Sequence, residues 1–183
     1  MFEQLLAKIA RTLDAADLPY MVIGGQAVLR YGEPRLTDDV DVTLGAGPEA
    51  LPSVLEQVEA MDLAPLVEDP ESFVRDTMVL PCADAETETR VDLVFSFSPY
   101  EKRALERARR GEVGNATVRF AAPEDVIIHK LVAGRPRDHE DVKGILAKTS
   151  DLDEAYLRRW LDDFSAALDQ PLTDQFDDLQ AQA

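Results

Sequence analysis

The chain has 183 residues, of which 30% are charged and 45% are apolar, proportions that suit one globular domain with a small helical extension. Its formal net charge of −17 argues against a large nucleic acid held in a basic groove, because phosphate contacts need Lys and Arg. Cys82 is the only cysteine, no apolar run is long enough to span a membrane, and the first residues do not form a signal peptide, so we expect a cytoplasmic protein with no membrane partner.

Helical and extended segments alternate along the first part of the chain. Leu5, Leu6, Ile9 and Leu13 recur at helical spacing, which predicts an amphipathic helix over residues 2–15. We then expect a strand at 20–23, a turn at Gly24-Gly25, a short helix at 26–31, a strand at 37–44 and a helix from Pro48 to about Met61.

The remainder of the chain predicts further strands and then helices. Residues 62–88 are less regular; we expect one helical turn from Pro70, a strand at 77–81 and a polar hairpin loop at 83–88. After these come a strand at 89–96, a helix at 99–110, a turn at 111–115, a strand at 116–121 and helices at 123–134, 137–148 and from Asp151 or Asp153 to about Leu168.

This order of elements predicts an α/β (α+β) fold, in which a mixed, twisted sheet is flanked by helices. We expect residues 1–121 to form the core and residues 122–170 to form a helical C-terminal segment packed on it. Residues 171–183 are polar and acidic and are expected to form a frayed tail.

Two aspartates in the second strand are the first candidates for chemistry. Asp39 and Asp41 point to the same side of a strand because side chains alternate, while Val40 and Val42 point into the core. Two carboxylates on one face repel each other, and two Mg²⁺ ions about 3.5–4 Å apart would remove that repulsion and support phosphoryl-type chemistry. The alternative is an acidic strand face exposed to solvent.

The Gly24-Gly25 turn precedes these aspartates and leads into a helix. The first N–H groups of a helix have no partner within it, so they are suited to a phosphate, and Gln26 could assist them. A tight strand-to-helix turn with positive φ explains the same glycines. The two interpretations are compatible.

The sequence Ile23-Gly24-Gly25, followed after thirteen residues by Asp39-Val40-Asp41-Val42, resembles the nucleotidyltransferase superfamily of the DNA polymerase β type. The segment from Arg35 to Asp41 is similar to small bacterial members such as the AbiEii-like toxins and their stand-alone relatives. The resemblance covers about residues 15 to 146 and implies the nucleotidyltransferase fold. Many relatives have Ser where this chain has Gly25, so a hydroxyl that would contact the phosphate is missing here.

The resemblance also implies a third carboxylate on a later strand, and Asp92 in Arg90-Val91-Asp92-Leu93-Val94-Phe95 supplies it. In the family this group binds the catalytic metal and helps to deprotonate the attacking hydroxyl. A charge within an apolar run is costly unless it is paired or bound to metal. The alternative places Asp92 on the exposed face of an edge strand.

Two basic residues are candidates for phosphate contacts. Arg35 precedes the acidic strand and could bind phosphate or pair with Asp38 or Glu33. Lys130, with the segment after it, resembles a C-terminal motif in which a lysine binds phosphate, but it could equally be a surface lysine with a packed stem. Asp138 and Asp141 share a helix face, where they could orient Lys130 or Arg137 or be solvated.

These features predict an Mg²⁺-dependent nucleotidyltransferase with two ions held by Asp39, Asp41 and Asp92. An acceptor hydroxyl on a small molecule, a protein or an RNA end would attack the α-phosphate of an NTP such as ATP. The alternative is a non-catalytic binding module, such as an antitoxin-like regulator with a toxin–antitoxin partner, that keeps the fold; the loss of Ser at position 25 favours it, and the intact carboxylate set favours the enzyme.

Overall fold

The computed structural model of the chain describes residues 2–183 and divides into two compact units. The sheet unit comprises the residues before Ala27 together with Thr37–Ala121. The helical unit comprises Ala27–Leu36 together with Ala122–Ala183. Helix α2 (Gly24–Tyr31) begins in the sheet unit and continues into the helical unit.

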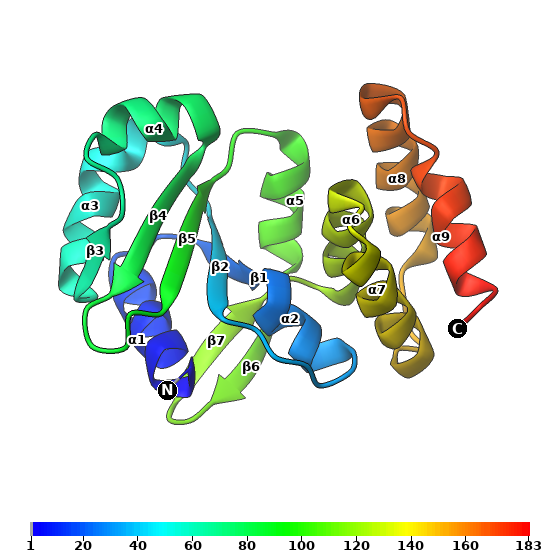
Figure 1. The fold of residues 1–183 in the computed structure, drawn as a ribbon, viewed down its shortest axis with the longest axis horizontal. Helices are drawn as coiled ribbons and strands as arrows, with labels where there is room; N and C mark the ends of the chain where they lie inside the picture. The colour runs from blue at the N-terminus through cyan, green and yellow to red at the C-terminus, as the bar shows by residue number, and fades with distance from the viewer. Residues whose placement is uncertain (1) are drawn as a thin grey trace. The chain divides into compact units, whose positions relative to one another are not determined.

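Within residues 2–183, the sheet unit builds one seven-stranded mixed sheet of order β3-β4-β5-β2-β1-β7-β6 (Figure 1). Strand β2 is parallel to β5 and β1 is parallel to β7, whereas the other neighbours are antiparallel. The strands are β1 (Tyr20–Ile23), β2 (Asp39–Leu44), β3 (Leu63–Pro65), β4 (Val79–Asp84), β5 (Arg90–Phe95), β6 (Arg109–Val113) and β7 (Ala116–Phe120).

Apolar helix faces cover this sheet. Helix α1 packs against β6 and β7, α3 against β3, and α4 against β4. The buried positions of α1 follow the predicted helical period, and Val40 and Val42 of β2 are completely buried, as the strand alternation predicts. The helices are α1 (Phe2–Ala15), the short 3₁₀ helix η1 (Pro48–Ala50), α3 (Leu51–Ala60), α4 (Pro70–Thr77) and α5 (Pro99–Arg107).

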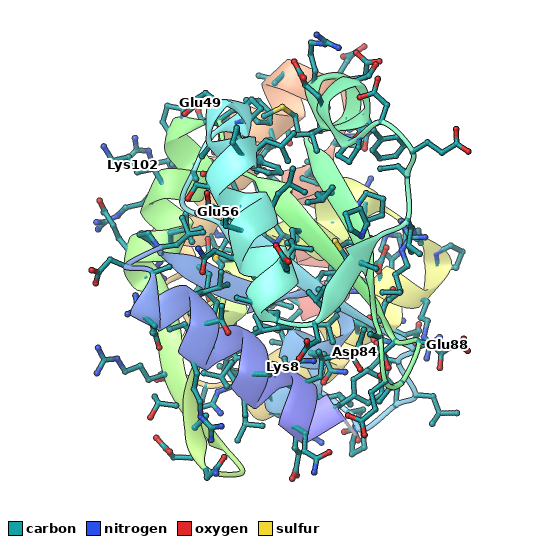
Figure 2. The ribbon with its side chains drawn as sticks, turned by 90° about the vertical axis from the view of Figure 1, so that its left-hand side faces the viewer. Lys8, Glu49, Glu56, Asp84, Glu88 and Lys102 are labelled. Atoms are coloured by element: carbon teal, nitrogen blue, oxygen red, sulfur yellow. The ribbon has the colours of Figure 1, made fainter. Side chains whose placement is uncertain are left out.

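A partly buried ion pair ties α1 to the end of β4. Figure 2 shows Lys8 and Asp84 pointing toward each other, and Lys8 Nζ lies 2.5 Å from Asp84 Oδ1. The second carboxylate oxygen of Asp84 accepts hydrogen bonds from the N–H and the hydroxyl of Thr87. Burial alone would raise the pKa of Asp84, but these hydrogen bonds and the Lys8 charge outweigh it and lower the pKa.

The helical unit contains α6 (Pro123–Ala133), α7 (Pro136–Lys148), α8 (Glu154–Leu168) and α9 (Leu172–Gln180), which pack on one another. Pro occupies the first turn of α6, and Gly134, at φ +62°, ends that helix in the left-handed region. Asp153 caps α8 by accepting a hydrogen bond from the N–H of Tyr156, as one of the two predicted caps.

The prediction of a mixed sheet flanked by helices, followed by helices, is confirmed. Two expectations about the chain are wrong. Residues 109–113 form strand β6 rather than the end of a helix and a turn, because pairing with β7 overrides a sequence with almost no apolar alternation. The segment after Pro171 forms α9 rather than a frayed tail, because its apolar residues share one buried face: Leu172, Phe176 and Leu179.

Smaller differences concern the ends of elements. Helix α2 begins at Gly24 itself, so the two glycines form its first residues rather than a separate turn. Strand β2 begins at Asp39, two residues later than expected, and α4 is a full helix rather than a single turn. Across residues 2–183 no helix has the length and apolar character that a membrane span requires.

Candidate functional site

The three predicted carboxylates lie on two neighbouring strands of the sheet unit. In the parallel pairing of β2 with β5, Asp41 is opposite Asp92 and Asp39 is opposite Arg90. Since side chains two residues apart on a strand share a face, all four side chains are on one side of the sheet. Each of the three carboxylates is half-buried, with Asp92 18% exposed.

Strand β5 is an interior strand, between β4 and β2, so the alternative that placed Asp92 on an edge strand is wrong. Its neighbours Val91 and Leu93 are completely buried on the opposite face. The apolar residues on either side of Asp92 therefore face the core of an interior strand. Asp92 itself faces the side of the sheet that carries Asp39 and Asp41.

Arg90, which the sequence interpretation treated only as part of a motif, lies on this acidic face. Its Nε donates hydrogen bonds to both carboxylate oxygens of Asp92, at 2.9 and 3.1 Å. The pKa of Arg90 is raised, first by the hydrogen bond and charge of Asp92 and then by the charges of Asp39 and Asp41. The guanidinium therefore acts electrostatically on all three carboxylates.

Thr37 is a second residue that sequence reasoning missed. Its hydroxyl donates a hydrogen bond to Asp39 Oδ1 at 3.0 Å, which orients that carboxylate from the loop before β2.

The glycine turn lies directly against Asp41. Gly24 has φ +62°, and a Cβ placed on it would be 1.9 Å from Asp41 Oδ2. The predicted need for positive φ is confirmed at this position, and only hydrogen fits between the backbone and the carboxylate. The start of α2 and the carboxylate of Asp41 are therefore neighbours within the sheet unit.

Gln26, at the first turn of α2, is 7% exposed. Its Nε2 has no hydrogen-bond partner among the described residues. A buried donor without a partner costs about 1–3 kcal/mol, so such a group marks a place where a ligand acceptor would be favourable. Gln26 therefore offers a hydrogen-bond donor at the start of α2, where the sequence predicts a phosphate contact.

The two predicted basic residues lie in the helical unit, in one cluster of opposite charges. Lys130 Nζ lies 2.7 Å from Asp138 Oδ1 and 2.9 Å from Asp141 Oδ2, and Arg35 Nε lies 2.9 Å from Asp141 Oδ1. Arg35 therefore pairs with Asp141 rather than with Asp38 or Glu33. The surface-lysine interpretation is wrong, since the Lys130 side chain is only 13% exposed, and both aspartates orient it as one of the alternatives predicted.

Basic side chains of α7 hold the loop that contains Arg35. Arg137 donates to the carbonyl oxygen of Leu36 at 3.0 Å, and Lys148 donates to that of Gly32 at 3.1 Å and pairs with Glu33. Residues 32–36 are thus held to α7 at several points within the helical unit.

The three carboxylates on the sheet face suit a magnesium ion that also takes ligands from a substrate. No three His, Cys, Asp or Glu side chains within residues 2–183 are grouped closely enough to hold a metal by themselves. Mg²⁺ in phosphate-handling sites is usually held by one or two carboxylates, waters and the phosphates of the substrate. The carboxylates of Asp39, Asp41 and Asp92 match that chemistry and suit an ion delivered with a nucleotide.

Two other features of the sheet unit lie outside this arrangement. A cavity of ≈ 990 Å³ is lined in part by residues that directly follow the C-terminal ends of β2 and β5, including Gly45 and Phe97. None of the predicted site residues lines it. Burial, with a smaller contribution from the charge of Asp92, raises the pKa of the Cys82 thiol to about 12, so the thiol is protonated at neutral pH.

Comparison with known proteins identifies a family. The profile of a family described as nucleotidyltransferase of unknown function matches residues 1–179. No curated protein matches the sequence significantly.

Solved structures show the same fold at low sequence identity. The solution structure of the antibiotic-resistance factor ANT(2'')-Ia has a TM-score of 0.63 and 18% identity, covering 91% of this chain and 94% of that one. A nucleotidyltransferase-like antigen from Paracoccidioides brasiliensis has a TM-score of 0.59 and 16% identity, covering 96% and 91%. The lincomycin-bound lincosamide adenylyltransferase LnuA has a TM-score of 0.56 and 14% identity, covering 80% and 97%.

Proposed function

Since this chain belongs to the family of nucleotidyltransferases of unknown function, we propose that it transfers a nucleoside monophosphate from an NTP to an acceptor hydroxyl. The acceptor oxygen forms a bond to the α-phosphorus, the bond from that phosphorus to the bridging oxygen breaks, and pyrophosphate leaves. The observation that carries the proposal is the strand register that sets Asp41 opposite Asp92, with Asp39 on the same face and Gly24 against Asp41.

In this proposal each residue of the sheet unit has a separate task. Asp39, oriented by Thr37, and Asp41 would hold Mg²⁺ together with the phosphates, and the ion would supply charge neutralisation. Asp92 would complete the metal site and accept the proton of the attacking hydroxyl. The first N–H groups of α2 and Nε2 of Gln26 would hold a phosphate oxygen.

The proposal does not need Arg35 or Lys130. Both cations are balanced by Asp138 and Asp141 within the helical unit, so neither is an uncompensated positive charge that requires a phosphate. Their contact with the nucleotide, and the number of metal ions, stay predictions.

For the acceptor we propose a small hydroxylated molecule that carries positive charge. The fold neighbours include ANT(2'')-Ia, whose structure was solved with adenylyl-2''-tobramycin, and the lincomycin-bound LnuA. The net charge of −17 adds an independent reason, because an acidic surface attracts cations and repels an RNA end.

The test is a transfer assay with each α-labelled NTP, Mg²⁺ and a set of hydroxylated amines, followed by detection of labelled product and of pyrophosphate. We expect label on a small cationic acceptor in the parent protein and none in Asp41→Asn. Label on a protein or an RNA in a cell extract would replace the proposed acceptor class. No product with any NTP, acceptor or extract would contradict the enzymatic function.

A non-catalytic binding module, such as an antitoxin-like regulator, is the second candidate. The observations that favour it are Gly25 in place of Ser and the engagement of both Asp92 oxygens by Arg90. This candidate predicts that an NTP binds without turnover. A neighbouring reading frame for a small helical toxin would identify the partner.

A further inference from the structure

Among the described residues of the sheet face, Arg90 is the basic side chain that lies with the carboxylates of Asp39, Asp41 and Asp92. Its position follows from register, since Arg90 is opposite Asp39 and two residues before Asp92. Both hydrogen bonds to Asp92 come from the same nitrogen, Nε, and occupy both carboxylate oxygens. A divalent ion that uses those oxygens must therefore compete with the guanidinium.

We propose that Arg90 is a resident counter-ion of this site: it neutralises Asp92 while no metal is bound and releases Asp92 when a divalent cation arrives with its nucleotide. The inference rests on the proposed function for the presence of that cation. It assigns Arg90 a regulatory role, which is to keep the free protein from binding metal tightly before the nucleotide is present.

Competition for the oxygens of Asp92 supports the exchange. Arg90 Nε contacts both of them, so a divalent ion that binds Asp92 takes the same oxygens. The positive charges of the ion and the guanidinium also repel each other at that distance. The guanidinium is then expected to leave Asp92, which becomes available as a metal ligand.

The side chain of Arg90 is built to move. It is 56% exposed, and its hydrogen bonds and ion pair within residues 2–183 all run through Nε, so its terminal amino groups have no hydrogen bond to a described residue. A planar guanidinium binds two phosphate oxygens at once. Released from Asp92, Arg90 can therefore contact the phosphates of the incoming nucleotide without a change in the backbone of β5.

The test compares the affinity for Mn²⁺ alone, measured by calorimetry, in the parent, in Arg90→Gln and in Arg103→Gln. Arg103 is a matched control, since its side chain is 57% exposed and it pairs at 2.9 Å with Glu106, away from the three carboxylates. We expect about tenfold tighter Mn²⁺ binding for Arg90→Gln, because one competing positive charge is removed. The control should match the parent.

The outcomes separate this inference from the proposed function. Equal or weaker Mn²⁺ binding by Arg90→Gln, with binding by the parent intact, would overturn the counter-ion role and leave the metal site standing. Failure of every variant to bind Mn²⁺, with or without ATP, would overturn the metal site itself.

A second measurement needs no metal. The counter-ion role predicts that Arg90→Gln lowers the melting temperature of the metal-free protein, and that this loss is smaller in an Asp92→Asn background, where the main partner is neutral. An equal loss in both backgrounds would show that Arg90 does not act through Asp92 and would overturn the inference.

Discussion

Two clusters of charged side chains in this protein differ in their balance. On the sheet face, three carboxylates share one cation, Arg90, which is 56% exposed. In the helical unit, Asp138 and Asp141 share two cations, Arg35 and Lys130, and the four side chains are 4%, 6%, 18% and 13% exposed.

The difference indicates what each cluster is for. A buried cluster with equal charges satisfies itself, and removing one member leaves a buried charge without a partner. Carboxylates in excess repel one another until a cation binds among them. Such an arrangement is expected at a site whose ligand is a cation. The predictions below test this difference, first in the two clusters and then at a glycine and an ion pair outside them, from the largest expected effect to the smallest.

Removing one carboxylate from the sheet face should have the largest effect. Asp41→Asn should reduce transfer by about a thousandfold, because charge stabilisation in the transition state is the main contribution asked of this face. It should also remove the rise in melting temperature that Mg²⁺ and NTP cause in the parent. The control is Asp38→Asn, which removes an exposed acid next to the strand. Comparable losses in both variants would contradict a specific role for Asp41.

Breaking the balanced cluster should instead affect folding. Lys130→Met should lower the free energy of unfolding by about 3–5 kcal/mol, because it leaves Asp138 and Asp141 buried with one cation fewer. Lys143→Met is the matched control, since Lys143 pairs only with the exposed Glu140 and should change stability by about 0.5 kcal/mol or less. The measurement is urea unfolding of both variants.

The same variant also tests the phosphate role predicted for Lys130. At a temperature where Lys130→Met is folded, a lysine that serves only the cluster leaves NTP affinity unchanged. A loss of NTP affinity in the folded variant would assign Lys130 to the nucleotide.

A smaller effect is expected where the backbone meets the acidic face. Gly24→Ala should cost about 2–4 kcal/mol, because the added Cβ meets Asp41 Oδ2 and the residue must keep φ +62°. Gly114→Ala is the control, since Gly114 has φ +57° but nothing within 4 Å of the added Cβ, and only the cost of φ, about 1–2 kcal/mol, applies. Equal costs would show that the contact with Asp41 is unimportant.

The smallest effect concerns Asp84, a buried carboxylate with a cation partner in the sheet unit. Because its pKa is lowered in the folded state, its contribution is present above the unfolded pKa of about 4 and is lost as the pH falls through the folded pKa. Asp84→Asn should therefore reduce stability by about 1 kcal/mol at neutral pH and by less at pH 3. The measurement is the free energy of unfolding against pH, and a loss independent of pH would contradict it.

The sequence predicts the parts of this fold that depend on local patterns. Helix α1 and strand β1 have the expected bounds. The spacing of Leu5, Leu6, Ile9 and Leu13 predicts the buried face of α1, and the apolar run Tyr20–Ile23 predicts β1. The common face of Asp39 and Asp41 follows from alternation along a single strand. The expectation of a frayed tail overlooks the helical spacing of Leu172, Phe176 and Leu179, a signal for α9 that the sequence does carry.

Other features were decided only by tertiary structure. The sequence alone does not say that β5 lies beside β2, and that pairing is what puts Asp92 opposite Asp41 and Arg90 among the carboxylates. Strand β6 exists because β7 offers hydrogen bonds to a segment with little apolar pattern of its own. Such pairings join segments far apart in the chain, and their energies depend on neighbours that no local window contains.

By itself, the sequence determined which residue types could carry the chemistry: two glycines before a helix, and carboxylates alternating with buried valines. The tertiary structure decided which charges meet. It gave Asp141 to Arg35 and Lys130, which lie on other elements, because ion pairs form between side chains that the fold brings within about 3 Å of each other. The pair of Arg90 and Asp92 joins two positions on the same face of one strand and follows from alternation instead.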